Sequence, residues 1–181
     1  MTTSTHSPAG QAAATQTDPE RADLLAGLGT ARHFLRFTVG DLTDEQARQR
    51  TTASELTLGG LIKHVAAIES GWVDFILAGP STMTGSEDRM ARYADGFKLL
   101  PGETLAGVLA GYAEVARRTD DLVASLPDLN LSHPLPPAPW FRPGEKRSAR
   151  RVFLHIIAET AQHAGHADII RESLDGAKTM G

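Results

Sequence analysis

The stretch that decides the fold is Leu154–Gly176, LHIIAETAQHAGHADIIRESLDG. At about 100° per residue, and with His155 set at zero, Glu159 falls near ~40°, His163 near ~80° and His166 near ~20°. Isoleucine and valine side chains share this arc. The pattern therefore predicts an amphipathic helix with four ionisable side chains on the face that is turned to the core.

Other segments have the same helical periodicity. Asp18 and Pro19 form a helix start, Gly79-Pro80 is a strong stop, and Thr43–Gln46 has the form of a capping box. Long helices are expected over about 19–37, 58–77, 104–126 and 147–174. Because strand signals are poor, the predicted fold is all-α, a four-helix bundle with two long loops at about 80–102 and 127–146.

Composition indicates a globular protein: 41% of the 181 residues are hydrophobic and 22% are charged. Residues 1–18 lack large apolar groups and are expected to be a flexible tail, with a single domain over 19–181. No apolar run resembles a signal peptide or a membrane span, so a cytoplasmic protein without a membrane partner is expected. The net charge of -4 argues against a nucleic-acid partner.

The chain contains seven histidines and no cysteine. It therefore has no disulfide, no thiolate metal site and no cysteine nucleophile. Three histidines are interpreted as background. His6 lies in the predicted tail, His33 is expected to be structural, and His133 is expected to be exposed in the proline-rich loop.

The remaining histidines form patterns with glutamate. His155 and Glu159, and Glu159 and His163, are four residues apart, a spacing that suits either a hydrogen-bonded pair or two ligands of a divalent cation. A metal site in a bundle also needs a ligand from a facing helix. His64, the only histidine of the second long helix, is either that ligand or a core residue. Glu69 is either a group that supports the ligands or a solvated charge.

Two motifs resemble the DinB/YfiT-like superfamily of metal-binding four-helix bundles, over residues 20–176. The first comprises His64, Glu69 and Trp72, and the second is the segment 159–168, ETAQHAGHAD, with a terminal Leu-Asp-Gly. Both are similar to an actinobacterial branch. The resemblance implies the metal ligands His64, Glu159 and His163. Many members carry histidine at the position of Glu159, and this departure resembles the His-Glu-His set of mycothiol-dependent maleylpyruvate isomerases.

The resemblance also implies a chemistry. Relatives commonly bind zinc, although nickel, iron or manganese also suits such ligands. Three ligands leave an open position, at which the metal would activate the thiol of an external cofactor, mycothiol or a similar molecule, for transfer to an electrophilic substrate or for isomerisation. Activation of water would use the same site. A homodimer is compatible, since relatives are commonly dimers.

Other residues are assigned supporting roles. His155, His166 and Glu69 are placed behind the ligands or against the substrate. Loop residues are candidates for positioning the cofactor, with Trp140 and Arg142 expected to bind it: Arg89, Arg92, Tyr93, Trp140, Phe141 and Arg142. The alternative function is a non-catalytic metal-binding bundle that serves a stress response or an interaction.

Overall fold

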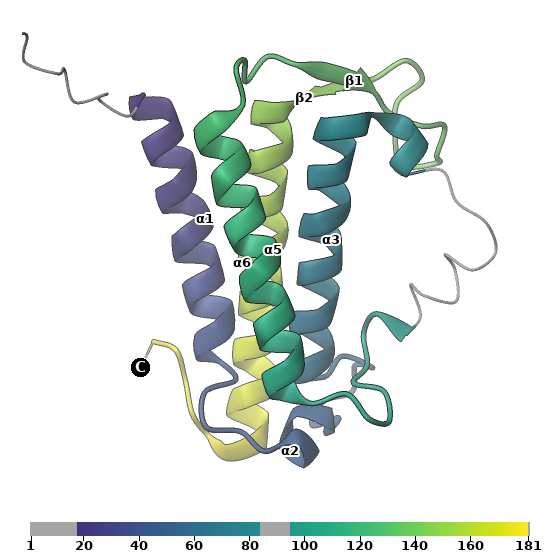
Figure 1. Ribbon diagram of the computed structural model, residues 1–181. Coiled ribbons are helices and arrows are strands. Elements are labelled where there is room, and N and C mark those ends of the chain that lie inside the picture. The colour runs from purple at the N-terminus through teal and green to yellow at the C-terminus, as the bar shows by residue number, and fades with distance from the viewer. Residues whose placement is uncertain (1–17, 84–94, 181) are drawn as a thin grey trace, which may run out of the picture.

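The computed structural model describes residues 18–83 and 95–180. Four long helices lie side by side in a bundle (Figure 1): α1 (Pro19–Phe37), α3 (Leu58–Ala78), α5 (Leu105–Ser125) and α6 (Ala149–Asp175). The short helices α2 (Asp44–Arg48) and η1 (Pro80–Thr82) lie in the connections. The predicted all-α bundle is confirmed. Residues 1–17 of the predicted tail over 1–18 and the loop residues Arg89, Arg92 and Tyr93 lie outside the described residues.

The helices begin and end where local chemistry dictates. The Asp18 side chain accepts the Glu20 N–H, and the Thr57 and Ser148 hydroxyls do the same for the N–H groups three residues on in α3 and α6. The predicted capping box precedes α2, with reciprocal bonds between Thr43 and Gln46. α6 ends at Gly176, whose φ of 80° is a left-handed conformation that favours glycine.

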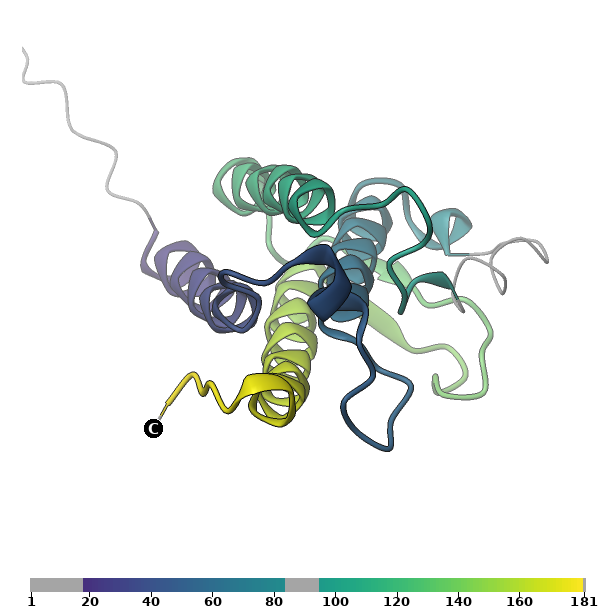
Figure 2. The same ribbon diagram turned by 90° about the horizontal axis from the view of Figure 1, so that it is seen from below.

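The four helices pack around two apolar clusters, with a polar layer between them. α1 packs along α6, and α3 packs against both α5 and α6, whereas the contact between α1 and α5 is smaller than these three (Figure 2). One cluster contains Leu61 and Ile170, and the other contains Phe75 and Phe153. This layer consists of buried polar side chains, among them Glu69.

Two short strands, which the poor strand signals do not predict, form in and directly after the loop expected at 127–146. β1 (Ser132–Pro134) and β2 (Lys146–Ser148) pair in antiparallel fashion, with His133 opposite Arg147. The pair crosses one end of the bundle, and its connecting loop lies on the side away from α1 (Figures 1 and 2). Each strand is only three residues long, too short to show alternation in a sequence.

His133 is expected to be exposed, and this expectation is also wrong. Its ring is half-buried, lies 5.7 Å from the Phe75 ring, and its Nε2 is 3.1 Å from the Ile76 carbonyl oxygen. β1 therefore packs on the end of α3. Among the helices that the structure describes, none combines the length and the apolar character that crossing a bilayer requires.

Candidate metal centre

Three side chains from two facing helices meet at one point. His64 projects from α3, and Glu159 and His163 project from adjacent turns of α6. One ligand atom of each lies within 4.8 Å of the other two. Glu159 Oε2 is 3.5 Å from His163 Nε2. The three predicted ligands are thus brought together, in a donor set of two imidazoles and one carboxylate that fits a divalent transition metal.

The ring of His166 contacts the ring of His163 beside this set. The Nδ1 atoms of the two rings are 3.4 Å apart, and the His163 Nε2 faces Glu159. A ring that binds a metal through Nε2 carries its proton on Nδ1. His163 would then donate from Nδ1 to the Nδ1 of His166, the arrangement in which a partner fixes the tautomer of a ligand.

His64 lies in the most enclosed part of the centre. It is 6% exposed, and the Phe97 ring stacks on it with 3.9 Å between ring centroids. Burial, and then the neighbouring His163, lower the pKa of His64 from 6.5 to about 4. The ring is consequently neutral at pH 7, which is the form that binds metals. Burial also lowers the pKa of His163, with His166 adding to the effect.

The centre lies at the edge of the core, where solvent reaches it. His155, Glu159, His163 and His166 are all partly exposed, with 31% of the Glu159 side chain accessible. The fully buried arc of α6 is instead formed by other side chains, namely Val152, Phe153, Ile156, Thr160, Ala164, Ala167 and Ile170. The periodicity of isoleucine and valine alone places the ionisable face too deep, because alanine and threonine also form part of the buried side of α6.

His155 lies on the outer side of Glu159. Its Nε2 is 3.8 Å from Glu159 Oε1, and its ring lies edge-on to Trp72 at 5.0 Å. It is not part of the group of three whose ligand atoms are mutually close. Burial, followed by the charge of Arg147, lowers its pKa, which the Glu159 carboxylate partly opposes.

The environment of Glu69 matches neither of its two expected roles, a group that supports the metal ligands or a solvated charge. It is fully buried, so it is not a solvated charge, and its hydrogen bonds go to Arg32 on α1. The Arg32 Nη2 lies 2.5 Å from Glu69 Oε1, and its Nη1 lies 2.8 Å from Asp120 Oδ1. This ion-pair network connects α1, α3 and α5 within the polar layer.

A comparison with protein families decides the relationship. The model of the mycothiol S-transferase family matches residues 23–176. The chain belongs to this DinB-like family. Membership implies that a small-molecule thiol is one of the reactants. No curated protein matches the chain.

Trp140 and Arg142 are the two loop residues that are expected to bind the cofactor in this member of the mycothiol S-transferase family. Both lie at the surface. Trp140 is 77% exposed and contacts the Phe141 ring edge-on. Arg142 is also exposed. On the strand β2 that follows this loop, the Arg147 guanidinium lies over the Trp72 ring, and its charge helps to lower the pKa of His155 beside the candidate ligands. No local pattern in the sequence predicts a role for Arg147, because only the hairpin places it there.

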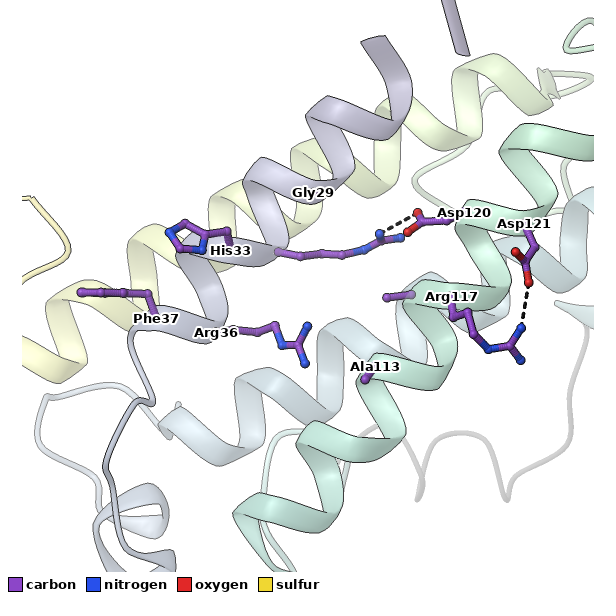
Figure 3. Close-up of a pocket in the computed structure, with 10 residues that line it drawn as sticks. Gly29, His33, Arg36, Phe37, Ala113, Arg117, Asp120 and Asp121 are labelled. Atoms are coloured by element: carbon purple, nitrogen blue, oxygen red, sulfur yellow. Dashed lines mark hydrogen bonds and ion pairs between the residues drawn. The ribbon is translucent and has the colours of Figure 1, made fainter. Parts of the chain in front are cut away.

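A cleft of about 700 Å³ opens elsewhere on this member of the family, between α1 and α5 (Figure 3). Its walls carry His33, Arg36 and Phe37 from α1, and Arg117 from α5. None of the three clustered side chains lines it. We therefore associate the chemistry with the partly exposed cluster on α3 and α6, where titratable groups converge.

Proposed function

We propose that this protein is a metal-dependent mycothiol S-transferase whose metal is held by His64, Glu159 and His163. The convergence of these three side chains, in a chain of the mycothiol S-transferase family, carries the proposal. Zinc is the expected ion because two histidines and one carboxylate are a common catalytic zinc set. Nickel, iron and manganese remain alternatives for the same donors.

The number of ligands supports a catalytic centre. Structural zinc sites are usually closed by four protein ligands, whereas catalytic sites keep a position open. In the part of the chain that the structure describes, the candidate group contains three residues, and His155 and His166 lie beside it. A divalent metal in this position would supply one thing, a lowered pKa for a thiol that binds there.

The remaining functions belong to the protein. His166 fixes the ring of His163, and Phe97 covers His64. Glu159, being partly exposed, is open to the reactants. Since the chain has no cysteine, the sulfur has to come from the cofactor. In the transfer, a sulfur–carbon bond forms, the leaving group departs with its electron pair, and the thiol proton passes to solvent.

The experiment measures metal and transfer together. Mycothiol and monobromobimane are mixed with the zinc-loaded protein, and the rate of thioether formation is followed by fluorescence above the uncatalysed background. We expect catalysis by the wild type and its loss in His163→Ala, which should also lose stoichiometric metal on dialysis. Gln162→Ala, at the exposed neighbouring position on α6, is the matched control and should retain both.

Two outcomes would count against the proposal. Full metal occupancy in His163→Ala would show that the ligands are others. Stoichiometric zinc without any transfer over background, with several thiols and electrophiles, would instead favour a non-catalytic metal-binding bundle.

A further inference from the structure

Arg147 occupies an unusual position for an arginine. It lies in β2, opposite His133 of β1, and residues that face each other in an antiparallel pair project to the same side. His133 packs on Phe75 of α3. Arg147 accordingly points at the same end of α3, where its guanidinium carbon lies 4.8 Å from the centroid of the Trp72 ring.

Two aromatic rings enclose the guanidinium. The Phe141 ring lies 5.3 Å from the same carbon, and only 11% of the Arg147 side chain is exposed. Cation–π contacts of this kind satisfy the faces of the guanidinium but none of its N–H donors. Within the described residues, Nε and Nη1 are buried and have no hydrogen-bond acceptor. The Glu145 carboxylate is 3.7 Å from Nε, beyond hydrogen-bond distance.

Such an arrangement is costly in the free protein. Arginine stays charged at all physiological pH values, and a buried charge without hydrogen bonds loses its hydration without replacement. Burial, and then the positive charge of Arg151, lower the pKa of Arg147, which the Glu145 carboxylate partly opposes. An anion that enters here would supply the missing acceptors, and planar carboxylates match guanidinium best.

The position of Arg147 relative to the metal centre indicates that the anion is part of a reactant. Trp72, which stacks on Arg147, also contacts the ring of His155, and His155 contacts Glu159. His155 lies one helical turn, about 6 Å along the axis, from Glu159. A reactant of modest size at the metal centre would therefore extend past His155 to Arg147.

We propose that Arg147, between Trp72 and Phe141, binds a carboxylate of the electrophilic substrate while the reacting carbon lies at the metal centre. The binding of carboxylates is independent of the transfer reaction, whereas their role as part of the substrate rests on the proposed function. The preferred substrates are then anionic electrophiles.

Binding is tested without turnover. The chain has two tryptophans, so Trp140→Phe leaves Trp72 as the sole reporter of fluorescence. In this background, with and without zinc, we expect phenylacetate to change the Trp72 emission saturably and phenylacetamide to have no effect. Arg147→Gln should weaken phenylacetate binding by about tenfold to a hundredfold, since hydrogen bonds to charged groups are lost.

A matched control separates a local effect from a change in net charge. Lys146 precedes Arg147 on β2, is exposed, and points to the opposite face of the ribbon. Lys146→Gln should bind phenylacetate as the wild type does. Arg147→Met keeps the packing of the aliphatic stem, and phenylacetate should raise the melting temperature of the wild type but not of this variant. This second measurement holds even if Arg147→Gln folds poorly.

Failure of the carboxylate site can be distinguished from failure of the proposed transferase function. Absence of carboxylate binding, or binding that Arg147→Gln leaves unchanged, would overturn the carboxylate site even in an active transferase. If transfer is active, Arg147→Gln should lower kcat/KM at least tenfold for an electrophile with a carboxylate and not for its amide. Equal losses for both electrophiles would overturn the substrate role. The preference for mycothiol over other thiols should be the same in the wild type and in the Arg147 variants, because the anion is on the electrophile.

Discussion

At the scale of single residues, the buried pair between Arg32 and Glu69 should be the most sensitive point of the bundle. Arg32→Met leaves the fully buried Glu69 carboxylate without its partner. Removal of one member of a buried ion pair typically costs about 3–5 kcal/mol. We expect a loss of this size in the free energy of unfolding, measured by urea denaturation followed by circular dichroism.

The double variant Arg32→Met/Glu69→Leu supplies the comparison. It removes both charges, and we expect it to recover at least half of the loss. Arg117→Met is the surface control, because Arg117 is 63% exposed and its ion pairs with Glu114 and Asp121 are solvated; its effect should stay within about 1 kcal/mol. A single variant as stable as the wild type would show that the pair does not stabilise the fold.

Only some of the contacts between the residues of the site could be predicted from the sequence. Glu159 and His163 lie one turn apart on one helix, so their proximity follows from helical geometry alone. The convergence of His64 on them needed the family resemblance, because periodicity places it equally well in the core. The positions of Arg147 over Trp72 and of Phe97 on His64 could not be predicted, since no local pattern specifies the path of the hairpin or of the segment at 97–99.

At the scale of elements, the first turn of α3 and the segment at 97–99 fit each other closely. A methyl group on Gly60 would lie 1.8 Å from the Phe97 carbonyl oxygen, and Phe97 stacks on His64. Gly60→Ala must displace this segment, so we expect a stability loss of about 1–3 kcal/mol. We also expect weaker zinc binding, measured by competition with a chromogenic chelator, although no ligand is changed.

Gly71→Ala on the same helix is the matched control. A methyl group there has no neighbour within 4 Å. Alanine is the better helix former by about 1 kcal/mol, so this variant should be equally or more stable and should bind zinc normally. Normal zinc affinity in a folded Gly60→Ala protein would contradict the role assigned to Phe97.

The helices were predictable because their ends carry their own signals. Asp18, Thr57 and Gly176 stand at the expected boundaries, and each acts within its own turn. The short strands were not, because two three-residue segments are stable only through their contacts with α3 and α6. The prolines of that loop indicated a binding segment and gave no sign of pairing.

At the scale of the whole molecule, metal binding should stabilise the bundle by mass action. Zinc at a free concentration of 100 times its Kd adds about 2.7 kcal/mol to the stability of the native state. For a chain of this size we expect the melting temperature to rise by roughly 5–11 °C over the chelator-treated protein. Differential scanning calorimetry gives the measurement.

His163→Ala separates the site from unspecific binding of zinc. This variant should melt at the same temperature with and without the metal, while Gln162→Ala should keep the full shift. A shift of equal size in His163→Ala would mean that zinc stabilises the protein at another place.

The position of the three ligands in the chain has a consequence for the order of events in folding. His64 and Glu159 are separated in the sequence by α5 and by both long loops, so they meet only after α3 and α6 have docked. During refolding, the uptake of a coloured ion such as cobalt would therefore report a late step, well after helices have formed. The time course of metal uptake would thus measure when the packing of the bundle is complete.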